Sequence, residues 1–264
     1  MLLHQFKEYV PRYFFFKDNC GFLPLNSGAA RVGADAVLGK LREEGALACK
    51  RVADSLGNGF FLMEYIDEKK AFLNKEIISV HKLKTFLSEL NDCIITEVVK
   101  NHPYAAAIAP NSLNTIRLLL VWDAEKCCFF IARAFHRFGC AGSIVDNLGA
   151  GNGLLVYVNP ETGELLGEGI ISENGKETYI RGEIRHPDTD VKLTGMFIPS
   201  FADIAKKCLD IFATHSYLRY LGLDIAVISD GFKIIEINSL TSLVTIQQRS
   251  GLLADPRIRA VLKH

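Results

Sequence analysis

Three side chains near the end of the chain, Asp224, Glu236 and Asn238, have oxygen atoms suited to binding a cation and fall within a strand pattern. Isoleucine- and valine-rich runs flank Ser229-Asp230-Gly231, which predicts a β-hairpin with Gly231 left-handed after the turn. A three-residue loop places Asp224 opposite Glu236 and puts Asn238 on the same face, whereas a two-residue Asp-Gly loop turns Asp224 away. We expect the three-residue loop, because it leaves an apolar opposite face.

The chemistry of this group is that of a hard cation site. Two carboxylates and an amide on one face repel each other unless a cation lies among them. Mg²⁺ prefers such oxygen ligands and is commonly held by one or two carboxylates together with substrate phosphates. The alternative is an edge hairpin whose Asp224 and Glu236 face water.

A second candidate site combines a lysine with glycines. The short strand ending in Lys50 is followed by a small-residue loop that contains Gly57 and Gly59, and then by another strand. Such a loop lets backbone N–H groups approach a phosphate, and the lysine adds a point charge. A hairpin with a glycine-rich turn and a surface lysine is the alternative.

Arginines at strand positions form a third set. Arg117 opens the strand at 118–122 after the string Asn111 to Thr115, and Arg137 lies in the alternating strand 129–138. An arginine at the start of a core strand has a carboxylate or phosphate partner, or extends to the surface. Asp146, Asn147 and a glycine cluster follow and could complete a phosphate pocket.

Other segments supply the elements that position these residues. Helical spacing predicts helices over 33–44, 80–91 and 200–220, and apolar runs predict a strand at 93–99 and a hairpin at 155–171. The aromatic stretch before residue 30 is expected to pack on the domain, with a docking arm or a membrane-skimming patch as the alternatives. His186, in a loop, is expected to be solvated, with a substrate-side role as the alternative.

Composition sets the limits. The 264 residues carry a formal charge of zero and are 49% hydrophobic, enough for one large domain or two packed lobes, and nothing suggests a nucleic-acid partner. The sequence has neither an apolar run long enough for a membrane-spanning helix nor a secretory signal pattern, so we expect a cytoplasmic protein. Seven cysteines without a C-x-x-C pair are expected to be buried, reduced thiols.

Taken in order, these motifs resemble the ATP-grasp superfamily. The S-x-N-T-x-R string ending at Arg117, and the order of Arg137, Asp146 and Asn147 before Gly151 and Gly153, resemble its sugar-transfer associated branch and the glutamate-ligase-like enzymes. The resemblance implies an α+β fold, with two α+β lobes whose antiparallel sheets clamp ATP between them. It divides the chain into an N-terminal arm (1–30), an N-terminal lobe (31–99) and a C-terminal lobe (100–264).

The resemblance also implies roles for individual residues. The metal ligands would be Asp224, Glu236 and Asn238; the catalytic cations would be Arg117 and Arg137; ATP would be bound by Lys50, Gly57, Gly59, Glu97, Val98, Lys100 and Asn147. Backbone groups near Glu97 and Val98 would read the adenine, although Glu97 could instead be a solvent-facing strand residue. The loop here has fewer glycines than fuller versions of the motif.

The implied function is a ligase that uses ATP and Mg²⁺. A substrate carboxylate would attack the γ-phosphate, and an amine would take the resulting acylphosphate, as in polysaccharide or peptide-conjugate biosynthesis. With about 30 residues before the first lobe, the acceptor is expected to be a protein, a peptide or a carrier-bound sugar, or a partner completes the site. The alternatives are a kinase of a small hydroxyl substrate and a non-catalytic ATP-binding module.

Overall fold

The computed structural model describes residues 4–25, 28, 30–52, 59–150, 152–239 and 241–262. The chain divides into two compact units, one of residues 11–99 and one that joins the N-terminal residues up to 10 with residues 100 onward. The N-terminal arm expected over 1–30 is therefore divided: residues 4–10 belong to the larger unit, and residues 13–24 form strands of the smaller one. None of the helices in the described ranges is long and apolar enough to cross a membrane.

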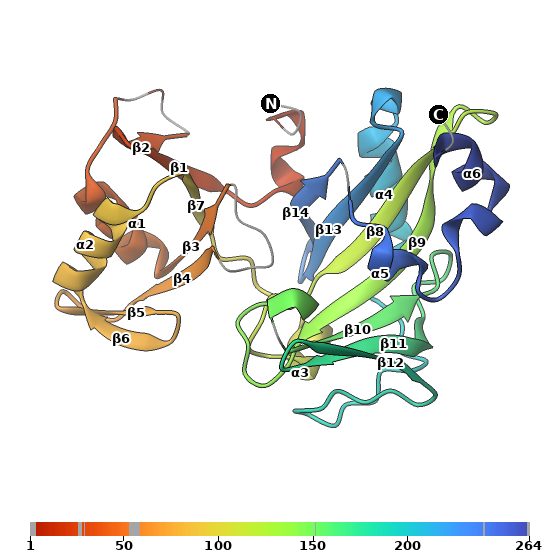
Figure 1. Ribbon diagram of the computed structural model, residues 1–264. Coiled ribbons are helices and arrows are strands. Elements are labelled where there is room, and N and C mark those ends of the chain that lie inside the picture. The colour runs from red at the N-terminus through yellow and green to blue at the C-terminus, as the bar shows by residue number, and fades with distance from the viewer. Residues whose placement is uncertain are drawn as a thin grey trace. The chain divides into compact units, whose positions relative to one another are not determined.

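The smaller unit is a sheet covered by helices (Figure 1). Within the described residues, its seven strands lie in the order β2-β1-β7-β3-β4-β5-β6, and all neighbours are antiparallel. The strands are β1 (Tyr13–Asp18), β2 (Gly21–Pro24), β3 (Ala46–Arg51), β4 (Phe60–Tyr65), β5 (Lys70–Leu73), β6 (Glu76–Ser79) and β7 (Cys93–Glu97). The helices are α1 (Ala34–Glu44) and α2 (Val80–Glu89).

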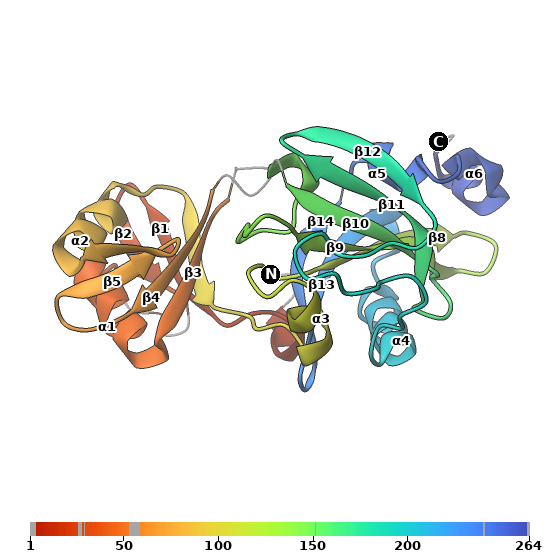
Figure 2. The same ribbon diagram turned by 90° about the horizontal axis from the view of Figure 1, so that it is seen from below.

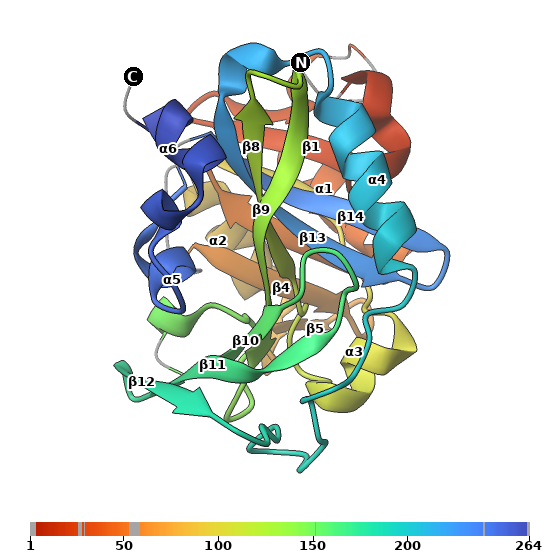
Figure 3. The same ribbon diagram turned by 90° about the vertical axis from the view of Figure 1, so that its right-hand side faces the viewer.

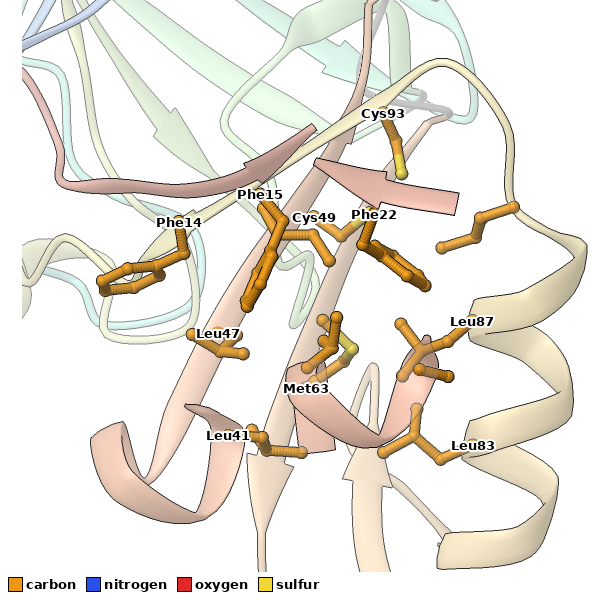
Figure 4. Close-up of a cluster of buried hydrophobic side chains, with 14 of the residues drawn as sticks. Phe14, Phe15, Phe22, Leu41, Leu47, Cys49, Met63, Leu83, Leu87 and Cys93 are labelled. Carbon is orange, nitrogen blue, oxygen red and sulfur yellow. The ribbon is translucent and has the colours of Figure 1, made fainter. Parts of the chain in front are cut away.

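A local signal fixes one end of each helix. The Ser79 hydroxyl caps α2 by accepting a hydrogen bond from the Lys82 N–H at 3.2 Å. Gly45 ends α1 at a φ of +77°, a value that favours glycine, and its N–H donates to the Leu41 carbonyl. Leu83 and Leu87 of α2 point toward Met63 of the sheet in a core that is fully buried at these positions (Figure 4).

The smaller unit begins and ends at the same place. The Glu97 N–H donates to the Arg12 carbonyl at 3.0 Å, and the Arg12 N–H donates to Glu97 Oε1 at 3.0 Å. The Arg12 guanidinium also pairs with Glu97 and Glu44, at 2.6 and 2.7 Å. The two chain ends of this unit are thus joined by hydrogen bonds and an ion pair.

The larger unit contains a second antiparallel sheet, whose seven strands in the described chain lie in the order β12-β11-β10-β9-β8-β13-β14 (Figure 2). The strands are β8 (Ile116–Asp123), β9 (Cys128–Gly139), β10 (Gly153–Val158), β11 (Leu165–Glu173), β12 (Lys176–Arg181), β13 (Tyr220–Ile228) and β14 (Gly231–Asn238). The α-helices are α3 (Pro103–Ile108), α4 (Phe201–Phe212), α5 (Val244–Gln247) and α6 (Pro256–Leu262). Short 3-10 helices are η1 (His4–Tyr9), η2 (Leu148–Ala150), η3 (Ser216–Leu218) and η4 (Leu252–Ala254).

Helices lie on both faces of this sheet (Figure 3). Helix α4 packs against β9 on one face, while α5 and α6 lie along the other, against β9 and β8. On the α5 and α6 face, Leu119, Phe135, Ile246 and Ile258 form part of one buried apolar cluster. The N-terminal η1 lies against β14, where the Tyr9 ring stacks on Phe232 at 5.2 Å. The aromatic N-terminal stretch therefore packs on the domain, as expected.

Candidate active site

The hairpin of β13 and β14 brings the expected cation ligands together. Asp224 pairs directly with Glu236, and Gly222 pairs with Asn238, so the predicted facing of Asp224 and Glu236 is confirmed. The predicted loop length is wrong, because Ile228 pairs with Gly231 and the turn contains two residues. A bulge between the pairs Ile225–Ile234 and Asp224–Glu236 adds one residue on β14 and restores the register.

Asp224 is held by two arginines. It lies on β13 between β8 and β14, is 4% exposed, and pairs in register with Arg117 of β8. The Arg117 guanidinium binds it through two donors, with Nε on Oδ1 and Nη2 2.8 Å from Oδ2. Arg137 Nη2 lies 3.0 Å from Oδ1. Burial alone would raise the pKa of Asp224, but the charges and hydrogen bonds of both arginines outweigh it and hold that pKa below its ordinary value.

Arg137 connects Asp224 to a second buried carboxylate. Its Nη2 donates to Thr115 Oγ1 at 2.6 Å, and the Thr115 hydroxyl and N–H donate to Asp146 Oδ2 at 2.6 and 2.7 Å. Burial works to lower the pKa of Arg137, but Asp146 and Asp224 hold it above the ordinary value. Burial raises the pKa of Asp146, and Arg137 and Thr115 offset this only in part. The group is therefore a charged network with a threonine at its centre.

Two threonines of this network were not predicted as site residues. Thr115 precedes Arg117 by two positions, so the two side chains share a face, and this spacing was a signal available in the sequence. Thr241 accepts a hydrogen bond from Arg117 Nη1 at 2.7 Å and follows Asn238 by three residues in a loop, where no periodicity applies.

The residues at the end of β14 remain more open than Asp224. Glu236 and Asn238 are partly exposed on the edge strand, and the Asn238 amide nitrogen is buried without a hydrogen-bond partner among the described residues. A half-turn of this amide would present its oxygen at the same place, which suits a cation. No group of three or more His, Cys, Asp or Glu side chains in the described ranges could hold a metal ion.

The donor set nevertheless fits Mg²⁺, which takes few protein ligands. Asp224 Oδ1 accepts hydrogen bonds from both arginines, whereas Oδ2 accepts one and keeps a lone pair. Glu236 supplies a second carboxylate directly opposite Asp224. Asn238 supplies an amide that the protein leaves unsatisfied.

In the smaller unit, Lys50 lies on β3 in register with Phe60 and is exposed. The Gly59 carbonyl, which is buried, accepts a hydrogen bond from the Arg51 N–H at 3.0 Å and closes the base of the loop. Gly57 lies outside the described residues, as does Gly151. That this loop binds phosphate, with a plain hairpin as the alternative, thus stays a prediction.

The expected adenine-reading segment is only partly available for hydrogen bonding. The Glu97 N–H and side chain are both occupied by Arg12, so Glu97 is neither a solvent-facing residue nor a free donor. Val98 is partly exposed, and Lys100 is exposed. Val98 is therefore the better candidate for a free backbone contact.

The remaining candidates have local roles in the structure. Asn147 Oδ1 accepts a hydrogen bond from the Gly149 N–H at 3.1 Å, and Gly153 begins β10 in contact with Leu148. His186 is 1% exposed, so the expectation of a solvated loop residue is wrong. Its Nε2 lies 3.1 Å from the Gly139 carbonyl, and its Nδ1 accepts from the Asp188 N–H at 3.3 Å, which fixes the ring in the interior.

Two solved structures that are similar to this chain are described as ligases. The D-Ala:D-Ser ligase VanG of Enterococcus faecalis is 10% identical, with a TM-score of 0.50, over 99% of this chain and 58% of that one. The ATP-grasp ligase PsnB, solved with a minimal precursor, Mg and ADP, is 14% identical with a TM-score of 0.43, over 99% of this chain and 55% of that one. The chain thus spans a little over half the length of these structures.

A search of curated proteins found no match. The family model described as "Sugar-transfer associated ATP-grasp" matches residues 15–262, which is nearly the whole chain. The expected α+β fold with two antiparallel sheets is confirmed. The chain therefore belongs to the sugar-transfer associated ATP-grasp family.

Proposed function

We propose that this protein is an ATP-dependent carboxylate–amine ligase that works through an acylphosphate. The observation that carries the proposal is the buried row of Arg117, Asp224 and Arg137, with Glu236 directly beside Asp224 on the edge strand. Such a row places two fixed cations next to a set of oxygen ligands, as the transfer of a phosphoryl group requires.

Arg137 is the best candidate for contact with a reacting oxygen. Its Nε and Nη2 donate to Thr115 and Asp224, while Nη1 donates to no described residue. Two N–H groups of Nη1 thus remain for a γ-phosphate or acylphosphate oxygen. Because the guanidinium is fixed by the Thr115–Asp146 network, it would bind that oxygen without first being ordered.

Glu236, Asn238 and Asp224 Oδ2 are the proposed ligands of Mg²⁺, which when bound would neutralise phosphate charge. Lys50 and the backbone at Gly57 and Gly59 are proposed to contact the phosphates. Val98, Lys100 and Asn147 are proposed to contact the rest of the nucleotide. Glu97, whose side chain pairs with Arg12, is proposed to fix the backbone just before Val98.

The acceptor is proposed to be an amine on a protein, a peptide or a carrier-bound sugar. The family's association with sugar transfer supports a place in polysaccharide or peptide-conjugate assembly. The donor carboxylate would bind near Arg117 and Arg137, whose charges favour the anion and the developing acylphosphate alike.

Calorimetry of ATP binding, with and without Mg²⁺, tests the nucleotide site. We expect binding by the wild type that depends on Mg²⁺ and weakens at least about tenfold in Glu236→Gln, a loss of about 1.4 kcal/mol. Glu161→Gln, in the exposed turn before β11, is the matched control and should bind like the wild type. A wild type that binds no nucleotide would remove the proposal.

Product analysis then separates the ligase from a kinase. With a carboxylate and an amine, a ligase of this type releases ADP and inorganic phosphate in equal amounts, whereas a kinase transfers the phosphoryl group to a hydroxyl and releases no phosphate. ³¹P NMR of the reaction mixture distinguishes the two. Nucleotide binding without ADP formation across a panel of carboxylates and amines would favour the non-catalytic module.

A further inference from the structure

A group of arginines lies on the α5 and α6 face of the larger sheet, apart from the residues discussed so far. Arg133 is on β9, Arg249 follows α5, and Arg257 is at the start of α6. Arg249 pairs with Glu168, and Arg257 pairs with Asp255 at 2.8 Å and lies 3.8 Å from the centre of the Phe130 ring. Both of these arginines therefore have a carboxylate partner.

Arg133 has none. Among the described residues it forms no ion pair; its Nη1 donates to the Ala132 carbonyl at 2.7 Å and its Nη2 to the Ser250 hydroxyl at 3.2 Å. Its Nε is buried and has no acceptor. Burial lowers the pKa of Arg133, and the nearby charges of Arg249 and Arg257 lower it further, against an opposing effect of Asp255.

This arrangement is unfavourable unless a counter-ion is bound. The hydration that the Arg133 guanidinium loses is replaced only by two hydrogen bonds to uncharged acceptors, its Nε keeps no acceptor, and two like charges beside it add repulsion. Natural proteins tolerate such a cluster where an anion neutralises it, because guanidinium groups bind phosphate and carboxylate through paired N–H donors. Arg249, Ser250 and Arg257 are solvent-exposed, which leaves the cluster open to a ligand.

We propose that Arg133, together with Ser250 and Arg249, forms a second oxyanion-binding site that holds a phosphate or carboxylate group of a ligand. The remaining Nη donors of Arg133 bind the oxyanion next to the buried Nε–H, the Ser250 hydroxyl turns to donate to it, and Arg249 supplies charge from the rim. The site does not depend on the proposed ligase activity.

The site is distinct from the proposed phosphate contacts. Arg133 and Arg137 lie on the same face of β9, four residues apart, which corresponds to about 13 Å along a strand. Phe135, which is 5% exposed and part of the apolar cluster under α5, lies between them. The Arg137 guanidinium is held at Thr115 and Asp224, and that of Arg133 at Ser250, so the two groups are directed to different partners.

NMR of the full-length chain can follow the Arg133 Nε–H directly. The signal is assigned by its loss in Arg133→Gln, and ¹⁵N-labelled wild type is titrated with sodium phosphate and with sodium acetate at constant ionic strength, with sodium chloride as the reference. We expect a saturable shift of the Arg133 signal by at least one of the two oxyanions. Saturation by phosphate alone identifies a phosphate group, and saturation by acetate identifies a carboxylate.

Further titrations test whether the anion binds at Arg133 and Ser250 and whether binding is independent of the nucleotide. Ser250→Ala should weaken binding severalfold. Arg259→Gln, which removes a side chain that donates to the Leu253 carbonyl, should not. The shift should persist with a non-hydrolysable ATP analogue and Mg²⁺ present. A response no larger than that to chloride, or one that the nucleotide abolishes, would overturn the proposal. Because ATP binding is measured separately, loss of the ligase proposal would leave this result unaffected.

Discussion

Asp224 is the carboxylate shared by two largely buried guanidinium groups, and Asp146 supplies the second negative charge beside Arg137. Asp224→Asn would remove the shared charge from Arg117 and Arg137. We expect the free energy of unfolding at pH 7 to fall by about 3 kcal/mol, the range seen when one partner of a buried pair is removed. Urea denaturation measures the loss, and Asp230→Asn at the exposed turn of the same hairpin should leave stability nearly unchanged.

The pH dependence of that loss follows from the lowered pKa of Asp224. A carboxyl whose folded pKa lies below its unfolded value of about 3.9 stabilises the protein fully above that value and loses the effect as pH falls through the folded pKa. The gap between wild type and Asp224→Asn should therefore be constant from pH 5 to 7 and shrink below pH 4. A gap that stayed constant into that acid range would argue against the ion pairs.

His136 gives a second pH prediction. Here burial keeps the group neutral in the folded protein, whereas Asp224 is kept charged by its partners. Its ring is fully buried, its Nε2 lies 2.7 Å from the Tyr104 hydroxyl, and burial lowers its pKa to about 3. Below about pH 6.5, His136 is protonated in the unfolded chain but stays neutral in the folded protein. The free energy of unfolding therefore falls as pH drops from about 6.5 toward 3.

Replacing this ring should make the dependence less steep. In His136→Gln, the slope of unfolding free energy against pH between 6 and 4 should decrease by about 1.4 kcal/mol per pH unit, the value for one proton. Tyr104→Phe removes the hydroxyl but no titrating group near neutrality, so its slope should match the wild type. Equal slopes in His136→Gln and wild type would mean that His136 is protonated in the folded state.

At this scale, the sequence predicted the identities of the charged residues better than their partners. Arg117 was expected to have a carboxylate or phosphate partner or to reach the surface, and the structure shows the carboxylate, Asp224. The strand periodicity behind that expectation is local. Thr241 could not be found in this way, since it reaches Arg117 from 124 residues away through a loop.

At the scale of elements, the hairpin shows both the strength and the limit of pattern reading. Alternating apolar residues fixed which side chains of β13 and β14 share a face near Asp224, because misplacing them would bury charge. The turn was misjudged by one residue, and the bulge in β14 compensated for the error. A bulge cannot be detected from the sequence of an isoleucine-rich run, because the extra residue is as apolar as its neighbours.

Gly222 of β13 allows the loop after β14 to approach the sheet closely. A Cβ at this position would lie 2.7 Å from Thr241 Oγ1 and 2.8 Å from Thr241 Cβ, closer than atoms pack. Gly222→Ala should displace Thr241, break its bond with Arg117 and destabilise the protein by about 1–3 kcal/mol. Thermal unfolding tests this, and Thr241→Gly should partly restore the stability of Gly222→Ala.

Gly251→Ala is the matched control for that experiment. A Cβ at Gly251 meets nothing within 4 Å, and its φ of −57° suits any residue. We expect its unfolding temperature to remain within about a degree or two of the wild type, as for most surface substitutions. Equal losses in the two alanine variants would indicate a backbone effect of glycine and not a clash with Thr241.

At the scale of the whole molecule, the chain enters and leaves the smaller unit once each, after residue 10 and before residue 100. The described part of residues 11–99 has its own sheet, the helices α1 and α2, and a continuous apolar core. We expect this segment, expressed alone, to fold cooperatively, because the described members of its core cluster all belong to the segment. A dispersed amide NMR spectrum and a sigmoidal urea transition would show this, and a collapsed spectrum would contradict it.

The domain expectation from sequence placed the second boundary between residues 99 and 100 and the first near residue 30. The polar break Lys100–Pro103 marks the second in the sequence. The first, near residue 10, has no such mark, because Tyr13 to Phe16 continue the aromatic run that begins with Tyr9 while entering a different unit. These residues belong to the smaller unit because β1 pairs with β7, which is distant in the sequence, and no local pattern predicts this pairing.

The hydrogen bonds between Arg12 and Glu97 have an evolutionary consequence. Two residues near the ends of this segment are bonded to each other. The segment could therefore be inserted, deleted or exchanged for a homologue with little change in the flanking parts of the chain. Joining residue 10 to residue 100 by a short linker would leave the host with both of its own ends intact. Recombination at these two points is thus a low-cost route by which such a protein could acquire a different smaller unit while keeping the arginines and carboxylates of the larger one.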